Sequence, residues 1–519
     1  MSVAQLTPAD LCRRLTQGWK AENAEIPREL LGRLSARWQA NVELQESAGP
    51  SAYRAALELN RLRLLGALDF GCLVLGPGAN VEREVATFWQ QQGGIGRLAI
   101  ILAATPAIRE AAQQATPSVP CLFLADGEIE ALLSEPGPLE VLKRHLRKHI
   151  PIRRLVPYDF MHPAAPNMFF GRRDLLERLR SEATTSFAIA GPGRIGKSSL
   201  LRQYRYELRR DLGDDRRHRL VRIDCYPYGN LSADTLARRI ALDISADSEA
   251  NRVNSATLLR FLKHRSWGGE KPIELLFDEV DSVCLNPAFA QLGEAVHNNY
   301  CRVILCGKGN LHRMVRKKET RFAQRLELIQ PEPLDEESAK RLLVEPLSDL
   351  GFTLQDKPWL CEGVLQLTQR RPHLIQACAK RLVELALGNQ NDTITPDHLR
   401  QLQEEFTAMS YATLPLEDLE DDLTRCVSLL WLRAGGGEAT VSSLQKLAEQ
   451  SGISLPASKA LDICYELWIC NVLSCERGVF APASPQLVQF VRKMDFGKEI
   501  TRLIQTLAPS QRVRAGLPS

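Results

Sequence analysis

The stretch of sequence that decides the fold is FAIAGPGRIGKSSLLR, residues 187–202. An apolar run ends at Ala190, a G-x-x-x-x-G-K-S motif follows it, and helix-forming residues begin where the motif ends. Strand, loop and helix in this order are the context in which the motif binds phosphate. Glycines let backbone N–H groups turn towards an anion, and the helix N-terminus adds a favourable dipole. The stretch therefore predicts a phosphate-binding loop in an α/β domain.

The loop and the first helical turn supply the candidate nucleotide contacts. These residues are Gly191, Pro192, Gly193, Arg194, Ile195, Gly196, Lys197, Ser198 and Ser199. We expect Lys197 to reach the β- and γ-phosphate oxygens and the Ser198 hydroxyl to ligate Mg²⁺. The alternative is a chance glycine turn in front of a helix, which does not explain why every fixed position of the motif is present.

A second apolar run, residues 273–277, ends in the two acids Asp278 and Glu279. Acids at the end of a neighbouring strand point towards the γ-phosphate, so we expect Asp278 to hold Mg²⁺ through water and Glu279 to polarise the attacking water. Glu279 joins Lys197 as a candidate catalytic residue, and Asp278 joins Ser198 as a candidate metal ligand. The alternative is a strand that ends in a solvated acidic turn.

A third apolar run, residues 302–306, ends in a polar, glycine-rich turn. We expect Lys308 or Asn310 in this turn to sense the γ-phosphate, and a turn without that role is the alternative. Asp281, which follows the two acids of the previous strand, is expected to cap a helix rather than to bind metal.

Length and composition limit the remaining possibilities. The chain has 519 residues, which corresponds to three or four domains at about 100–200 residues each. A net charge of +4, from 66 Lys plus Arg against 62 Asp plus Glu, excludes a surface that binds nucleic acid over its whole extent. The 13 cysteines form no CxxC pair and no CxxC-to-HxxxH spacing, so we expect free thiols, no structural zinc and a cytoplasmic location. The N-terminus lacks the apolar h-region of a secretion signal, and the most apolar stretch, residues 64–75, is too short for a membrane span, so no membrane partner is expected.

Hydrophobic periodicity divides the chain into seven parts, and the predicted fold class is α/β and multidomain. A parallel P-loop sheet is expected to be preceded by a smaller α/β domain and followed by helical and winged-helix domains. The parts are a helical segment 1–60, an α/β domain 61–150, a linker 151–166, the P-loop core 167–334, a helical lid 335–415, a winged helix 423–495 and a C-terminal helix and tail 496–519. The run KRHLRKHIPIRR, residues 143–154, carries six Lys or Arg and is interpreted as the approach to the linker, with a solvated helix face favoured over a nucleic-acid contact.

Four segments of the chain resemble the STAND class of P-loop ATPases and their archaeal-type AAA relatives. They are NMFFGRRDLLERL at 167–179, the acids at 278–279, PLDEESAKRL at 333–342 and RPHL at 371–374. The resemblance implies that Phe170 and Arg172 lie at the adenine and that Pro372, in the helical domain, contacts the nucleotide. The sequence departs from the family at Arg370, where a glycine is usual, and at Lys308, where a small hydroxyl residue is common.

The region 70–133 is similar to the latter half of Mrr-type restriction-endonuclease folds. Such nucleases need an acid and an E-x-K on adjacent strands to bind Mg²⁺, but the corresponding segment, residues 73–76, reads Leu-Val-Leu-Gly. The resemblance therefore implies an inactive nuclease fold that serves as a DNA-grip or oligomerisation module. An unrelated α/β domain is the alternative.

These observations predict a slow ATPase that acts as a STAND-like switch in signalling, defence or regulation, with ATP and Mg²⁺ as cofactors. The alternatives are a DNA-binding AAA+ ATPase resembling origin-recognition initiators, with Arg371 as its sensor arginine, and an adaptor that binds ATP without hydrolysing it. No guanine-reading N-K-x-D is evident. A homo-oligomer is left open, as is a DNA or protein partner of the winged helix. Its third helix, 457–468, carries only one basic residue, and the basic run 313–321 is a richer patch.

Overall fold

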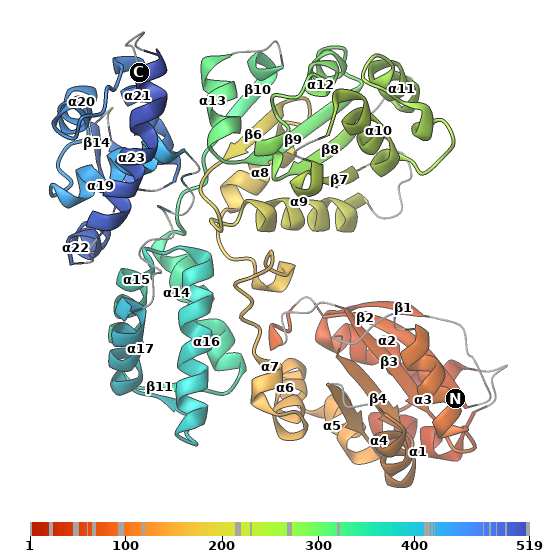
Figure 1. The fold of residues 1–519 in the computed structure, drawn as a ribbon. Helices are drawn as coiled ribbons and strands as arrows, with labels where there is room; N and C mark the ends of the chain where they lie inside the picture. The colour runs from red at the N-terminus through yellow and green to blue at the C-terminus, as the bar shows by residue number, and fades with distance from the viewer. Residues whose placement is uncertain are drawn as a thin grey trace. The chain divides into compact units, whose positions relative to one another are not determined.

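The computed structural model divides the chain into two compact units (Figure 1). The first unit comprises Met1–Phe170, Glu336–Leu365 and Ile375–Arg400, and the second comprises Gly171–Asp335, Gln366–Leu374 and Gln401–Ser519. The structure describes residues 3–19, 24–44, 51–59, 61–64, 69–91, 98–116, 120–212, 220–228, 231–266, 272–318, 322–408, 416, 419, 421–470, 472–476, 479–483, 485–493 and 496–514. Residues 219, 409–415, 494–495 and 515–519, which belong to expected elements, lie outside this set.

A five-stranded mixed sheet forms the centre of the N-terminal part of the first unit. Its strands, in spatial order, are β1 (Asn41–Leu44), β2 (Ala52–Glu58), β3 (Asp69–Leu75), β4 (Ala99–Ala103) and β5 (Cys121–Leu124). The pairs β1–β2 and β2–β3 are antiparallel, whereas β3–β4 and β4–β5 are parallel. Helices α3 (Val81–Gln91) and α4 (Pro106–Ala115) bury an apolar face with β3 and β4. The other helices here are α1 (Pro8–Gln17), α2 (Glu25–Trp38), α5 (Asp126–Ser134), α6 (Pro138–His149) and α7 (Ile152–Leu155).

The prediction of a wholly helical segment 1–60 is wrong, because β1 and β2 lie within it. Strand β2 reads AYRAALE, a composition of helix-forming residues. It is a strand because it pairs along its whole length with the apolar β3, from Ala52 opposite Leu75 to Glu58 opposite Asp69. Tertiary pairing here overrides local propensity.

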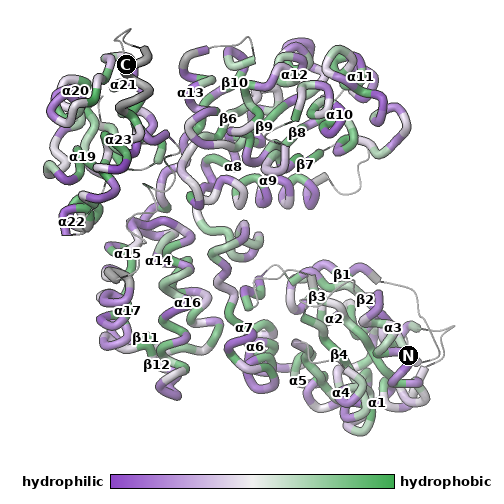
Figure 2. The backbone as a smooth tube through the Cα atoms, viewed as in Figure 1, coloured by the Kyte–Doolittle hydropathy of each residue, from purple (hydrophilic) through white to green (hydrophobic). Residues whose placement is uncertain are grey.

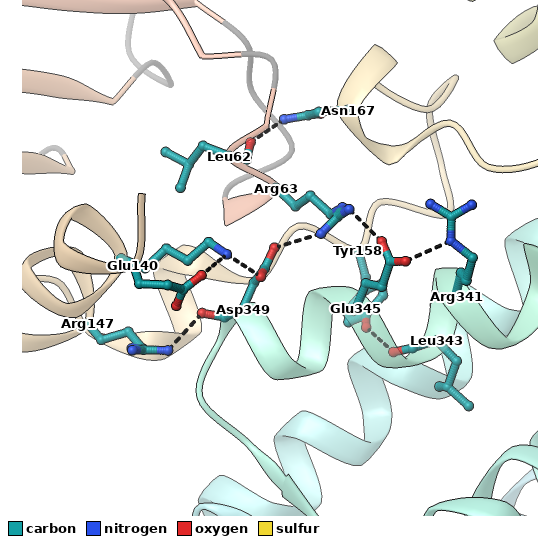
Figure 3. A network of polar contacts seen from close by, with 11 residues as sticks. Leu62, Arg63, Glu140, Arg147, Tyr158, Asn167, Arg341, Leu343, Glu345 and Asp349 are labelled. Carbon is teal, nitrogen blue, oxygen red and sulfur yellow. Dashed lines mark hydrogen bonds and ion pairs between the residues drawn. The ribbon is translucent and has the colours of Figure 1, made fainter. Parts of the chain in front are cut away.

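The expected linker 151–166 contains a helical turn and buried residues. Leu155 and Tyr158 are buried, and the Tyr158 hydroxyl donates a hydrogen bond to the Leu343 carbonyl, 2.7 Å away, on α14 (Glu336–Asp349) (Figure 3). The preceding basic run is not simply a solvated face either, because Lys143 is buried. Its ammonium lies 2.5 Å from a carboxylate oxygen of Asp349, at the end of α14.

Two further groups bind the same end of α14 (Figure 3). Arg63 forms ion pairs with Asp349 at 3.2 Å and with Glu345 at 2.5 Å, and Arg147 donates to the Asp349 carbonyl at 3.2 Å. The helical region continues with α15 (Lys357–Thr368), α16 (Pro372–Gly388) and α17 (Pro396–Ala408), and the two-residue strands β11 (Thr353–Leu354) and β12 (Thr393–Ile394) pair in parallel. Helix α14 is thus held by charged residues of the N-terminal part of its own unit.

A fully parallel five-stranded sheet is the core of the second unit. In spatial order its strands are β10 (Leu326–Ile329), β6 (Ser186–Ala190), β9 (Cys301–Gly307), β8 (Ile273–Asp278) and β7 (Leu220–Asp224). Figure 2 shows the central strands as hydrophobic segments, as expected for a parallel sheet covered on both faces. Its helices are α8 (Arg173–Ser181), α9 (Lys197–Leu212), α10 (Ala233–Ile244), α11 (Leu258–Arg265), α12 (Ala288–His297) and α13 (Gly309–Lys317). The chain is therefore a multidomain α/β protein.

A buried polar cluster joins the starts of β8 and β9 to α9. Glu274 lies 2.5 Å from both the Tyr204 hydroxyl and an Arg302 guanidinium nitrogen. Arg302 also donates to the Tyr204 hydroxyl at 2.7 Å and to the carbonyls of Thr185 and Leu179 at 2.8 and 2.6 Å. Each charge in this cluster has a partner of opposite charge or a hydrogen bond, as a buried ion pair requires.

The C-terminal part of the second unit has its own hydrophobic core. Its elements are α19 (Asp422–Arg433), α20 (Val441–Gln450), α21 (Ala457–Ile469), β13 (Leu473–Glu476), β14 (Val479–Pro482), α22 (Pro485–Lys493) and α23 (Gly497–Arg514). Three helices followed by a hairpin is the order that the sequence predicts, and the winged-helix assignment stays a prediction. All cysteines are free, and all except Cys475 are buried. Among the described residues, no helix combines the length and the apolar composition that crossing a bilayer requires.

Candidate nucleotide site

The predicted phosphate loop joins β6 to α9. Gly196 has φ +100°, and a Cβ at this position would lie 2.8 Å from a guanidinium nitrogen of Arg172. That guanidinium donates to the carbonyls of Ile195, at 2.5 Å, and Glu332, at 3.0 Å. Both the backbone conformation and the space therefore require glycine at position 196.

Arg172 contacts the loop rather than acting as a free cation beside it. Burial lowers the pKa of Arg172 to about 10, with Asp174 opposing that shift. Arg172 itself has a left-handed backbone, φ 59°, at the start of α8. The residue that the family resemblance places at the adenine is thus bound to the carbonyl side of the loop, where it braces Ile195.

Lys197 is buried, and its ammonium lies within the turn of the loop. Its Nζ donates to the carbonyl oxygens of Gly191 at 2.9 Å and Pro192 at 2.7 Å. The same residue begins α9, whose first backbone N–H groups have no partner inside the helix. The loop therefore brings a positive side chain and the positive end of a helix to one place.

The carboxyl ends of β6 and β8 bring together the two predicted metal ligands. Ser198 Oγ donates to Asp278 Oδ1 at 3.0 Å, and Asp278 is only 2% exposed. The second oxygen, Oδ2, pairs with Arg222 of β7 at 2.9 Å. A hydroxyl beside a carboxylate is a set of oxygen donors that suits Mg²⁺. Sequence reasoning missed Arg222, whose only signal is a charge in the middle of the short segment that forms β7.

Glu279 follows Asp278 but leaves the strand direction, because its backbone is left-handed, with φ 53°. Burial raises the pKa of the Glu279 carboxyl, Lys197 opposes the rise, and Asp278 adds to it. A carboxylate with a raised pKa near a buried ammonium has the properties of a general base. The catalytic role of this residue stays a prediction.

Asp281 caps a helix, as expected, but the helix is α13. Its carboxylate accepts backbone N–H bonds from Asn310 at 2.9 Å and Leu311 at 3.3 Å, and also from Lys308. The Asn310 amide donates to the Asp281 carbonyl at 3.3 Å. The residues proposed as γ-phosphate sensors are therefore tied to the segment that follows Glu279.

Pro372, the predicted nucleotide contact, is the first residue of α16. Gln369 and Arg370, which precede it in the sequence, have left-handed backbones. Arg371 is buried. His373, which sequence reasoning did not single out, lies against the backbone of Arg194 at the loop tip. Burial lowers the pKa of His373 to about 3, so its imidazole is neutral. This segment thus contacts the phosphate loop through His373.

Phe170, the other residue placed at the adenine by resemblance, ends the first of the three chain segments that make up the first unit. Its ring is buried, and the guanidinium groups of Arg63 and Arg341 each lie 5.7 Å from the ring centroid. These contacts are the geometry of cation–π pairs. The proposed position of Phe170 over a base stays a prediction.

Helix α13 also packs against α21 of the C-terminal part. Arg316 lies 2.5 Å from an Asp462 carboxylate oxygen and 4.2 Å from the Tyr465 ring centroid. His312 packs against the rings of Tyr465 and Trp468, and burial lowers its pKa to about 4. A cavity of about 310 Å³ lies between the two helices, lined by both signs of charge. The α21 face that contacts α13 is therefore already occupied.

Comparisons with known proteins give likeness at the level of fold. No family model and no curated protein matches the chain. Among solved structures, it is similar to the Walker-type ATPase PABY2304 of Pyrococcus abyssi, with 18% identity, 62% of this chain and 96% of that chain covered and a TM-score of 0.46.

Two further structures show weaker likeness. For the ORC2 protein of Aeropyrum pernix the identity is 14%, the coverage is 64% of this chain and 92% of that chain, and the TM-score is 0.43. For the RuvB Holliday junction branch migration motor of Thermotoga maritima the identity is 13%, the coverage is 62% and 95%, and the TM-score is 0.35.

Proposed function

We propose that the second unit binds ATP with Mg²⁺ and hydrolyses it slowly. The observation that carries the proposal is the meeting of Ser198 and Asp278, 3.0 Å apart, directly beside the buried Lys197. These residues come from the carboxyl ends of two strands that are separated by β9 in the sheet. The donor set fits a hard divalent cation, and the loop fits phosphate.

Each residue of the site has a proposed role in phosphoryl transfer to water. Lys197 leaves its loop carbonyls to pair with the β- and γ-phosphate oxygens, and Ser198 with Asp278 holds Mg²⁺. Bound Mg²⁺ supplies neutralisation of the charge that develops on the phosphate oxygens. Glu279 accepts a proton from the attacking water. Arg172 keeps the loop carbonyls turned away from the phosphate side by binding Ile195.

We propose that the bound molecule is an adenine nucleotide. Phe170 and Pro372 would contact it, as the family resemblance implies. Lys308, Asn310 or Arg371 would respond to the γ-phosphate. Asn310 is hydrogen-bonded to Asp281, which lies in the segment after Glu279. A displacement of Asn310 would therefore displace that segment, and the reverse also holds. This connection supports a conformational response to the nucleotide state.

The test is ATP turnover by the purified full chain, measured with and without duplex DNA. We expect Mg²⁺-dependent turnover that falls by about 10⁴-fold in Lys197→Ala, because a charge that stabilises transferring phosphate is worth about 10³–10⁵. Lys446→Ala, on the surface helix α20, is the matched control. Absence of nucleotide binding in the wild type, or equal turnover in Lys197→Ala, would overturn the proposal.

There are two interpretations of what ATP binding and hydrolysis would do in this protein. In a STAND-like switch, the α13–α21 contact is the point that nucleotide binding changes. In an initiator-like, DNA-acting ATPase, α21 enters a DNA groove. The acids Asp278 and Glu279, with Asp281 after them, occur in both classes by sequence resemblance.

The packing of α13 against α21 limits how α21 could bind DNA, because the same helix face is in contact with α13. Arg316 is engaged by Asp462 and Tyr465, and Lys459 pairs with Asp421 at 3.1 Å. Residues 319–321 of the basic run lie outside the described residues. We therefore propose that α21 contacts DNA only after release from α13. DNA binding that appears with ATP and weakens with salt would support the initiator-like interpretation, and turnover indifferent to DNA would support the switch.

The N-terminal part of the first unit is proposed to be catalytically inactive. Its strand β3 carries no acid and no lysine over residues 73–76, so a nuclease-type metal site has no ligands there. A grip or oligomerisation role is the proposed function of this part, and sedimentation of the full chain with and without ATP tests the second of these.

A further inference from the structure

The basic run near residue 145 contains a pair of histidines one helical turn apart. His145 and His149 are four residues apart on α6, and Glu128 faces them from α5. The His149 Nε2 atom lies 3.3 Å from Glu128 Oε1, and His145 Nδ1 lies 4.0 Å from the same oxygen. One ligand atom from each of the three residues fits within a mutual distance of 4.8 Å. Three potential metal donors therefore converge from two helices.

His145 is the most unusual of the three. Its residue is only 8% exposed, yet neither ring nitrogen has a hydrogen-bond partner. A buried imidazole without a partner loses the hydrogen bonds that it makes in water, so its burial is unfavourable unless another group binds the ring nitrogens. The two imidazole planes are within 10° of parallel, with centroids 6.2 Å apart. Because a ring nitrogen of each histidine and an oxygen of Glu128 lie within 4.8 Å of one another, one metal ion could supply the partner that the ring nitrogens of His145 lack.

Glu128 is held in place by its other oxygen. Its Oε2 accepts from the Ala125 N–H at 3.2 Å and lies 3.2 Å from Arg109. These contacts fix the carboxylate and leave Oε1 for the histidines, which is how surrounding hydrogen bonds orient metal ligands. Of the nearby cations on α6, Arg144 is paired with Glu135 at 2.6 Å. The His149 side chain is 24% exposed, so the site is open to solvent on one side.

We propose that Glu128, His145 and His149 bind one divalent transition-metal ion, Zn²⁺ foremost, with water completing the coordination. Two imidazoles and one carboxylate are preferred Zn²⁺ ligands, and two histidines at i and i+4 share one helical face. The expectation of no structural zinc rests on cysteine spacing, which does not cover a histidine pair completed by a distant glutamate. The site would join α5 to α6.

Two of the three proposed metal ligands lie on α6, the helix whose Lys143 and Arg147 bind the end of α14. Lys143 and Arg147 of α6 contact Asp349, while His145 and His149 face α5. A metal ion that fixes α6 would therefore also steady the cations that bind the end of α14. This makes the metal a structural brace of the first unit rather than a part of the proposed ATP site, whose phosphate loop and proposed Mg²⁺ ligands lie in the second unit.

The experiment is zinc binding by the chelator-treated full chain, measured against a chromophoric competitor. We expect one tightly bound Zn²⁺, and a loss of affinity of more than about 100-fold in His149→Ala, because even outer-shell partners of a metal are worth about 10–100-fold. Glu128→Gln should weaken binding while keeping an oxygen that can accept from Ala125. His162→Ala is the matched control, since His162 also pairs with an acid, Asp159, at 2.8 Å but is exposed.

Cobalt distinguishes this site from the cysteines, because Co²⁺ held by histidine and carboxylate gives ligand-field bands without a thiolate charge-transfer band. Thermal melts in chelator show whether His149→Ala folds as the wild type does, and added Zn²⁺ should raise the melting temperature of the wild type and of His162→Ala but not that of His149→Ala. Failure of the wild type to retain zinc, unchanged affinity in His149→Ala, or a thiolate band with Co²⁺ would overturn the proposal.

Discussion

The two ends of strand β8 carry the same kind of side chain in opposite circumstances. Glu274, near the start of the strand, is buried and contacts Tyr204 and Arg302, so its negative charge is neutralised by groups inside the fold. Asp278 at the end meets Ser198, beside the phosphate loop, and Arg222. In a parallel sheet the carboxyl ends face the helix N-termini and the loops, where a ligand can enter. The position along the strand, and not the residue type, separates the structural acid Glu274 from Asp278, the proposed metal ligand.

Glu279→Gln should produce the largest difference between the two ends. We expect ATP turnover to fall by about 10³-fold while nucleotide binding persists, because removal of a general base costs about 10²–10⁴. Single-turnover hydrolysis with a parallel binding assay measures both quantities. Glu438→Gln, an exposed glutamate in the C-terminal part, is the control. Turnover within a few fold of the wild type would remove Glu279 from the catalytic site.

Glu274→Gln should show the reverse pattern. Leaving Arg302 buried without its carboxylate should lower the free energy of unfolding by about 3 kcal/mol, and turnover per folded molecule should change little. Urea unfolding and active-site titration separate the two effects. If turnover falls as far as in Glu279→Gln while the protein stays folded, the distinction between the ends of β8 is wrong.

Arg222→Met tests the carboxyl end of β8, where Arg222 pairs with Asp278. The loss of the pair with Asp278 should destabilise the second unit by about 1–2 kcal/mol in Mg²⁺-free buffer, and Mg²⁺ with ATP should restore part of that loss by binding the folded state. Melting curves with and without the nucleotide test this. Arg238→Met, at an exposed position of α10, should show neither effect.

The pH dependence gives the smallest expected effect. Because burial raises the pKa of Glu279, the acid limb of turnover should lie above the range of an ordinary glutamate, with activity lost as pH falls through it. The free energy of unfolding should change in the opposite sense, since the folded state favours the protonated carboxyl and gains stability as pH falls through the raised pKa. A limb at the ordinary glutamate pKa would contradict the buried environment.

The sequence predicts the central strands of the second unit's sheet, because they are short apolar runs placed before polar turns, but it does not predict the edge strand β10. Residues 273–277 and 302–306 are examples, and β8 and β9 contain them. The motif at 191–198 likewise predicts the strand, loop and helix around Lys197. These signals are local, so a single sequence is enough to find them.

The rest depends on contacts between segments far apart in the chain. Nothing in AYRAALE predicts a strand until β3 is known to pair with it. Arg222, His373 and the partners of Arg172 become part of the site only through long-range packing, and Lys143 changes from a solvated cation to a buried one because Asp349 lies beside it. Polar residues of this kind are assigned by the fold and not by local pattern.

The Asp281 cap has a mechanical consequence. This carboxylate fastens the first turn of α13 to the chain two residues after the proposed base, so a movement of that segment would tilt the helix about its capped end. A helix of nine residues is about 13 Å long at 1.5 Å per residue, and a tilt of about 10° at its capped end would move its far end by about 2 Å. Arg316 stands near that far end, against Asp462 and Tyr465. A sub-ångström adjustment beside the γ-phosphate would thus be amplified into a displacement large enough to break an ion pair.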